Sequence, residues 1–144
     1  MGIFTSVKGI EYPYNFTVFP TLENHVQLTD TFVGLGGCTF LLSLETRNGN
    51  IIINDKTTYT SLDSFLLKIN NLRNIYSDRI FTLILNGKVA DKSLQTVLEK
   101  YLPRNELFYK EEKSNWPLYS SLLHSGKHFI VFANNKIPKQ VNPL

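Results

Sequence analysis

Four polar residues have side chains that could take part in hydrolysis: His25, Glu45, Arg47 and Asp55. An imidazole can move a proton near neutral pH, a carboxylate can act as a base or an acid, and a guanidinium can neutralise a phosphoryl charge. His25, Glu45 and Arg47 would form a hydrolytic site if they converged at the ends of neighbouring strands. We take the four residues as candidate catalytic residues.

The remaining histidines, His124 and His128, do not extend this set into a metal site. No two of the three histidines have the spacing that places both on one face of a helix, and Gly126 separates these two. Zinc would require Cys or carboxylate ligands at short spacing, whereas Cys38 is the single cysteine. A lone cysteine excludes an internal disulfide and favours a reducing, cytoplasmic location. We therefore expect no metal and no cofactor.

A glycine-rich segment, Gly34-Leu35-Gly36-Gly37, has the composition of a phosphate-binding loop. Such a loop follows a strand and opens a helix, so that backbone N–H groups point at the anion. Here the glycines precede an apolar segment typical of a strand, and no Gly-Lys-Ser/Thr sequence follows them. The segment therefore predicts a turn.

The N-terminus, Met1-Gly2 through Ser6, fits the pattern for N-myristoylation. Acylation of Gly2 would require a eukaryotic host or a virus of one. A single acyl chain gives only marginal membrane binding, and no basic cluster supplies a second signal. Gly2 is the lipidation candidate, and membrane contact through it would make the protein a peripheral one.

The composition fits one well-packed domain. The chain has 144 residues and 16.5 kDa, and it is 42% hydrophobic and 19% charged. Fifteen Lys and Arg face twelve Asp and Glu scattered between them, giving a net charge of +3. No basic stripe could follow a phosphate backbone, so we expect no nucleic-acid partner. No apolar segment approaches the length of a membrane span.

Local signals predict the elements that must position these residues. Asn48-Gly49 predicts a two-residue hairpin turn. Thr60 and Asp63 form a capping pattern before an apolar stripe from Leu62 to Leu72 at helical spacing. The expected strands are at 12–18, 38–44, 50–53, 80–85, 107–109 and 128–133. Helices are expected within 22–33, over 62–72, over 91–101 and from Pro117 to a cap at Gly126. Asp91 is the predicted cap of the third helix, and Pro103 ends it.

This alternation of strands and helices predicts the α/β class, with a mostly parallel sheet, flanking helices and one β-hairpin. Residues 1–135 are expected to form a single domain. Residues 136–144 contain two prolines and little to bury, and we expect a flexible C-terminal tail.

Several segments of the sequence resemble one enzyme family. Asn115-Trp116-Pro117-Leu118 followed by Gly126-Lys127-His128 and an apolar strand is similar to the phosphatidylinositol-specific phospholipase C X-domain-like family. Residues 64–86 and 27–54 resemble the family's preceding helix, strand and hairpin, so that the resemblance covers about residues 20–135 in order. It implies a TIM-like (β/α) barrel and a phosphodiesterase in which one histidine acts as the base and a second as the acid.

The sequence departs from this family at the catalytic positions. Asn24 stands near the first histidine position, with His25 displaced, and Asn54-Asp55 stands at the second. Ser43 replaces the family's strand aspartate and Cys38 its arginine. An amide cannot act as an acid, so we expect a catalytically inactive phospholipase-C-like domain that binds a protein or a phosphorylated ligand.

Length leads to a further expectation. A full barrel needs about 250 residues, so this chain could build about half of one and would leave open sheet edges. We therefore expect a protein partner or self-association through a sheet edge. Two alternatives stay open: a small phosphodiesterase or other hydrolase with a non-standard site, and a structural or assembly protein, for which a viral origin and myristoylation are further options.

Overall fold

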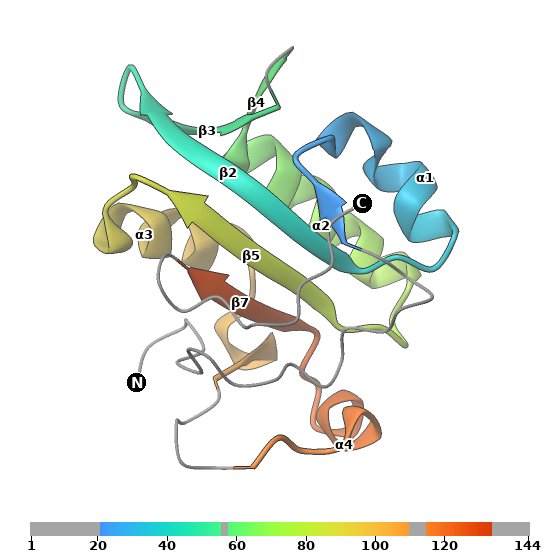
Figure 1. Ribbon diagram of the computed structural model, residues 1–144. Coiled ribbons are helices and arrows are strands. Elements are labelled where there is room, and N and C mark those ends of the chain that lie inside the picture. Colours follow the sequence, from blue (N-terminus) through green and yellow to red (C-terminus); the bar gives the residue numbers. More distant parts are fainter. Residues whose placement is uncertain (1–20, 56–57, 110–114, 134–144) are drawn as a thin grey trace.

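The computed structural model describes residues 21–55, 58–109 and 115–133 and confirms the α/β class (Figure 1). Helices flank a mixed sheet of seven strands. The strands are β1 (Leu22–Glu23), β2 (Thr39–Arg47), β3 (Asn50–Asn54), β4 (Tyr59–Ser61), β5 (Phe81–Gly87), β6 (Leu107–Phe108) and β7 (Phe129–Ala133). The helices are α1 (Thr29–Gly34), α2 (Leu62–Ile75), α3 (Asp91–Tyr101) and α4 (Tyr119–His124), with two short 3-10 helices, η1 (Val26–Leu28) and η2 (Arg104–Glu106).

The strands are ordered β4-β3-β2-β5-β7-β6, and β1 pairs with β2. The β1/β2, β2/β5, β5/β7 and β6/β7 pairs are parallel, whereas β2/β3 and β3/β4 are antiparallel. In a (β/α) barrel each strand lies beside the next one along the chain. Here β7 lies between β5 and β6, so the expected resemblance to half a barrel is not confirmed.

The hairpin between β2 and β3 forms where the turn signal predicts it. Asn48 and Gly49 have φ angles of 50° and 80°. Two successive positive φ values are typical of the type I′ turn, whose twist matches that of the flanking strands. Arg47 and Asn50 are register partners across this turn.

The caps of two helices lie one residue away from the predicted positions. The cap of α2 is Ser61, whose hydroxyl accepts the N–H of Ser64 at 3.1 Å, while Thr60 lies in β4. Asp91 is the first residue of α3 rather than its cap, and its carboxylate is favourable near the positive end of the helix dipole. The predicted apolar stripe of α2 is confirmed, since all five members are buried: Leu62, Phe65, Leu66, Ile69 and Leu72.

The Trp-Pro segment leads into a short helix. α4 begins at Tyr119, two residues beyond the predicted Pro117. Its predicted end is confirmed: Gly126 has a φ of 78° and donates its N–H to the Leu123 carbonyl at 3.0 Å. Positive φ is inexpensive for glycine, which makes it the usual residue after a helix.

The N-terminal part of the described chain is more divided than predicted. The single helix expected within 22–33 is replaced by β1, η1 and α1. The glycine segment forms the predicted turn between α1 and β2, and a Cβ on Gly37 would lie 2.4 Å from the Phe32 ring. The predicted strand at 12–18, the lipidation candidate Gly2 and the tail 136–144 lie outside the described residues.

Apolar side chains pack on both faces of the sheet. α2 and α3 lie behind the sheet in Figure 1 and cover the larger core, which includes Leu42, Leu83 and Val131. Leu122 of α4 belongs to a second cluster with residues that alternate with these along the strands, because neighbouring strand residues face opposite sides. The members of this second cluster are Ile80, Ile84, Leu122, Ile130 and Phe132, with Trp116 packed against it.

Candidate functional site

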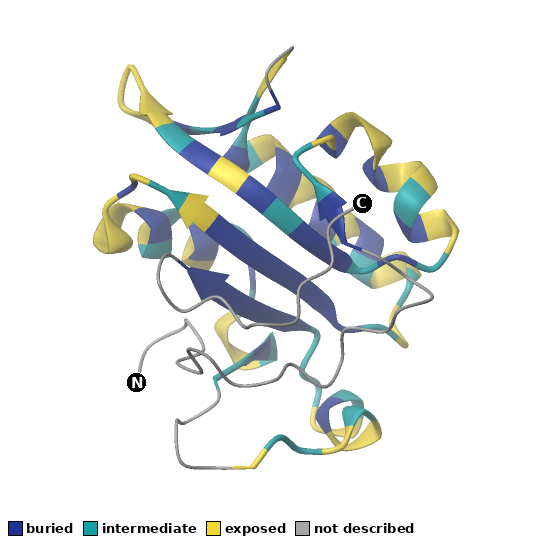
Figure 2. Cartoon of the chain, viewed as in Figure 1, coloured by how far each residue is buried: buried dark blue, intermediate teal, exposed yellow. Residues whose placement is uncertain are grey.

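Polar side chains gather where the parallel strands end. We call this set the carboxyl-end cluster: Asn24, which follows β1, with Ser43, Glu45 and Arg47 of β2 and Asn86 of β5. Ser43 and Asn86 are register partners on adjacent parallel strands, and both are exposed (Figure 2). Ligands of open α/β sheets bind at the carboxyl ends of the strands, which makes this cluster the candidate site.

One face of the sheet changes character along its strands. Towards the amino end, Leu41 and Ile84 belong to the apolar face on which α4 packs. Two residues further along the same face, Ser43 and Asn86 are exposed. Because side chains alternate between faces, Glu45 and Arg47 continue this polar surface along β2.

Asn24 holds the end of β1 against β2. It has a φ of 60°, a conformation that asparagine tolerates better than most residues. Its Oδ1 accepts the backbone N–H of Ser43 at 2.6 Å, and its Nδ2 donates to Ser43 Oγ at 3.3 Å. β1 pairs with β2 up to Leu41, and β3 pairs from Leu44 onward. The Asn24 amide therefore binds a backbone N–H in the interval between these two strands.

His25 is not joined to the other candidate residues. It is exposed and precedes η1, and its backbone N–H donates to the Glu23 carbonyl at 2.7 Å. Among the described residues, no hydrogen bond or ion pair connects its ring to Glu45 or Arg47. The structure thus brings Glu45 and Arg47 together and leaves His25 apart from them.

Arg47 is held from two sides. Its Nε lies 3.6 Å from Glu45 Oε1, and its guanidinium carbon lies 3.9 Å from the centre of the Tyr59 ring. Stacking of a guanidinium on an aromatic face restricts the side chain without using its terminal N–H groups. Within the described part of the chain these groups have no hydrogen-bond partner, so Arg47 can present a planar pair of donors to an anion.

The Asp55 side chain stabilises the turn between β3 and β4. Its side chain is buried, and its Oδ2 accepts the Thr58 hydroxyl at 2.7 Å. Its Oδ1 accepts the backbone N–H of Thr58. These contacts give the carboxylate a structural role in the loop.

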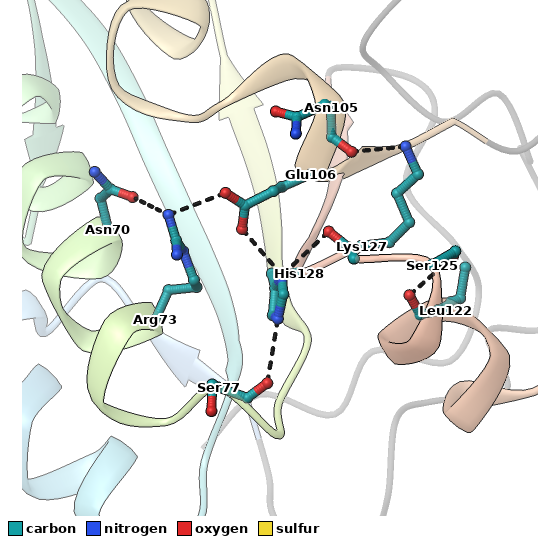
Figure 3. A network of polar contacts seen from close by, with 10 residues as sticks. Asn70, Arg73, Ser77, Asn105, Glu106, Leu122, Ser125, Lys127 and His128 are labelled. Carbon is teal, nitrogen blue, oxygen red and sulfur yellow. Dashed lines mark hydrogen bonds and ion pairs between the residues drawn. The ribbon is translucent and has the colours of Figure 1, made fainter.

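The other two histidines lie at the opposite end of the sheet. His128 immediately precedes β7, and His124 ends α4 just before it. The Nδ1 atom of His128 lies 2.9 Å from Glu106 Oε1, and its Nε2 lies 3.1 Å from the Ser77 carbonyl oxygen (Figure 3). All three histidines of the chain are described, and only His25 lies near the carboxyl-end cluster.

The single cysteine of the chain is not an activated nucleophile. Burial raises the pKa of the Cys38 thiol, and the opposing charge of Arg79 is the smaller effect. The neutral thiol is a poor nucleophile. Among residues 21–55, 58–109 and 115–133, no three His, Cys, Asp or Glu side chains are grouped to hold a metal ion. None of the helices described is both long enough and apolar enough to cross a membrane.

Sequence reasoning missed two residues of this region. Asn86 stands near the end of the mostly apolar strand β5, and the Tyr59 ring stacks against the Arg47 guanidinium. The signal for Asn86 was available, because a polar residue after an apolar strand falls at the carboxyl end of a parallel sheet. The contact with Tyr59 depends on pairing between strands and has no local signal.

Comparison with protein-family models, with curated proteins and with solved structures gives no significant match. The resemblance to the phospholipase C X-domain-like family therefore rests on the residues named above. Functional inference has to start from the carboxyl-end cluster itself.

Proposed function

We propose that this chain is a catalytically inactive, phospholipase-C-like binding module whose ligand contacts the carboxyl-end cluster. One observation carries the proposal: the side chain near the first catalytic position of the resembled family is Asn24, and its amide is hydrogen-bonded to Ser43 on both polar atoms. A group in this arrangement positions backbone and cannot exchange a proton with a substrate.

The residue at the second catalytic position of the resembled family also supports the proposal of an inactive domain. Asp55 occupies this region and binds Thr58 within its turn. Transfer of a phosphoryl group by acid–base catalysis needs two groups on opposite sides of one phosphorus atom. His25 has no imidazole opposite it, because His124 and His128 lie at the amino end of the sheet.

The chemistry of the cluster favours a phosphorylated ligand. Arg47, fixed beside Tyr59, offers paired donors that match a phosphate or carboxylate. Exposed Ser43 and Asn86 can donate to and accept from neutral hydroxyl groups. A ligand that combines a phosphate with several hydroxyl groups fits this set.

Calorimetric titration with an inositol phosphate tests the ligand class. We expect binding to the wild-type chain and a roughly tenfold or greater loss of affinity in Arg47→Ala. The matched control is Arg104→Ala, which removes an arginine of similar exposure that is paired with Glu99 far along the chain. Wild-type protein that does not bind, or equal losses in both variants, would contradict the assignment of the ligand to this cluster.

Protein association through a sheet edge is a second proposal. β4 and β6 lie at the two ends of the strand order and have three and two residues. Edge strands offer backbone groups to a strand from another chain. Thr60→Pro is expected to disrupt β4, where Thr60 pairs with Ile53 of β3, and to weaken binding of such a partner, whereas Arg47→Ala should leave binding of that partner unchanged. A pull-down with each variant separates the two activities.

A further inference from the structure

A cavity lies between the β2–β3 turn and the helices α2 and α3. Its volume is about 410 Å³, near the lower end of the range of about 300–1,000 Å³ that is usual for small-molecule sites. Its wall includes residues 49–51, Asp63 in the first turn of α2, and one face of α3. The α3 residues of the wall follow one another at helical spacing: Ser93, Thr96, Val97 and Lys100. The cavity therefore has the size of a site for a small molecule.

This cavity is separate from the carboxyl-end cluster. Ile51, which contributes to its wall, belongs to the core that α2 and α3 cover. Ser43 and Asn86 instead continue the opposite face of the sheet, on which α4 packs. A ligand in the cavity is thus independent of the function proposed above.

Two opposite charges line the cavity without pairing with each other. The Lys100 ammonium forms no ion pair or hydrogen bond within the described part of the chain, and it lies 5.3 Å from the centre of the Tyr101 ring. Asp63 is half-buried, and its Oδ2 accepts the Tyr101 hydroxyl at 2.8 Å. Its Oδ1 has no hydrogen-bond partner among the described residues. Both charged groups can therefore bind a ligand.

The rest of the wall is uncharged. Ser93 lies about 10 Å from Lys100 along the axis of α3. Val97 is half-buried and adds apolar surface between them, whereas Ser93 and Asn50 are exposed groups that can donate and accept hydrogen bonds. A matching ligand has its charges near Lys100 and a neutral chain that extends toward Ser93.

We propose that this cavity binds an α-amino acid with a neutral side chain. The ligand carboxylate pairs with Lys100 and the ligand ammonium with Asp63, so that both contacts are charge-assisted hydrogen bonds. One cation and one anion give the wall no net charge, which matches a zwitterion. A ligand with a single charge would leave one of the two protein groups without a partner.

Calorimetric titration with L-glutamine tests this pairing, because L-glutamine combines the zwitterion with an aliphatic stem and a neutral polar end. Two analogues are the ligand controls: glutaramate lacks the ammonium, and γ-aminobutyramide lacks the carboxylate. We expect saturable binding of L-glutamine and roughly tenfold or greater loss of affinity with each analogue. No binding of L-glutamine up to about 10 mM, or analogues that bind equally well, would overturn the proposal.

Two charge-removing variants test the residues. Lys100→Met keeps an unbranched side chain, and we expect roughly tenfold or greater loss of L-glutamine affinity. The matched control is Lys92→Met, which changes an exposed lysine of α3 outside the cavity wall and should leave the affinity unchanged. Asp63→Asn should lower the affinity to a similar extent.

Circular dichroism checks the fold of each variant, because Asp63 also contacts Tyr101. If Asp63→Asn does not fold, Lys100→Met still decides the outcome. Unchanged affinity in Lys100→Met, or an equal loss in Lys92→Met, would contradict the assignment of the ligand to this cavity.

Discussion

The two ends of the sheet use polar residues in different ways. At the amino end, Glu106 pairs with both Arg73 and His128, and the three side chains are only 15–21% exposed. At the carboxyl end, Ser43 and Asn86 are exposed and the Arg47 side chain is 50% exposed. Groups whose partners lie inside the protein stabilise the fold, whereas exposed groups can bind a ligand. The polar residues at the amino end thus stabilise the fold, and those at the carboxyl end are the ones we propose for function.

The amino-end network joins several elements through one carboxylate (Figure 3). Glu106 lies 3.0 Å from Arg73 Nη2 of α2 and 2.9 Å from His128 Nδ1 before β7. His128 also reaches the Ser77 carbonyl between α2 and β5, at 3.1 Å. Both ring nitrogens are thus in contact with protein oxygens. Removing the carboxylate would leave a half-buried guanidinium without its ion-pair partner.

The largest expected effect lies where β2 and β5 approach each other at the carboxyl end. A Cβ on Gly87 would lie 2.1 Å from the Leu44 carbonyl oxygen, and Gly87 has a φ of 144°. We expect Gly87→Ala to lower the free energy of unfolding by about 3 kcal/mol or more, as measured by urea denaturation. Gly49→Ala is the control, because its φ is 80° but no atom lies within 4 Å of the added Cβ. It should cost about 1 kcal/mol. Equal losses would show that close approach of the strands is unimportant here.

The next effect tests the amino-end network. Glu106→Gln keeps the size of the side chain and removes its charge, and we expect a loss of about 1–3 kcal/mol in the free energy of unfolding. Glu99→Gln is the matched control, since Glu99 pairs at 2.9 Å with Arg104, whose side chain is 58% exposed. Its expected cost is about 0–1 kcal/mol. A cost for Glu99→Gln as large as that for Glu106→Gln would remove the contrast between buried and exposed pairs.

Alkaline pH should weaken the amino end through Tyr119. Burial raises the pKa of its phenol to about 12, and the hydroxyl accepts the N–H of Ile80 before β5 at 2.8 Å. The unfolded phenol ionises near pH 10, so the contribution of the neutral group is present below that pH. It is lost as the pH rises toward about 12. The stability difference between the wild type and Tyr119→Phe should shrink over this range. A constant difference would contradict the burial effect.

The smallest expected effect on stability belongs to the carboxyl-end cluster. Arg47→Ala should change the free energy of unfolding by less than about 1 kcal/mol, because the Arg47 and Glu45 side chains are 50% and 37% exposed and their atoms are 3.6 Å apart. The same variant should lose inositol phosphate binding. Thermal unfolding and titration of one protein sample measure both quantities. A large loss of stability would place Arg47 with the structural residues and remove the proposed difference between the two ends.

Local signals predicted much of the fold. The Asn48-Gly49 turn, the buried stripe of α2 and the cap at Gly126 each depend on residues close in sequence. The order of β6 and β7 in the sheet does not, because it depends on contacts between segments far apart. The cap of α2 was misplaced by one residue because Thr60 and Ser61 are both good caps, and pairing with β3 places Thr60 in a strand.

The candidate site could be predicted in part. Ser43, Glu45 and Arg47 alternate along β2, so a common face follows from strand geometry. The separation of His25 from Glu45 could not be predicted, because the chain turns after β1 through the positive φ of Asn24. The amide contacts of Asn24 likewise depend on where β1 ends and β3 begins beside β2.

Turnover of phosphatidylinositol vesicles measures the central claim most directly. Release of inositol phosphate by the full chain is compared with that of His25→Ala, the variant lacking the one imidazole near the carboxyl-end cluster. We expect both proteins to match the protein-free rate, since no second imidazole lies at that end of the sheet. Wild-type turnover that is abolished in His25→Ala would contradict the account and make the protein a phosphodiesterase.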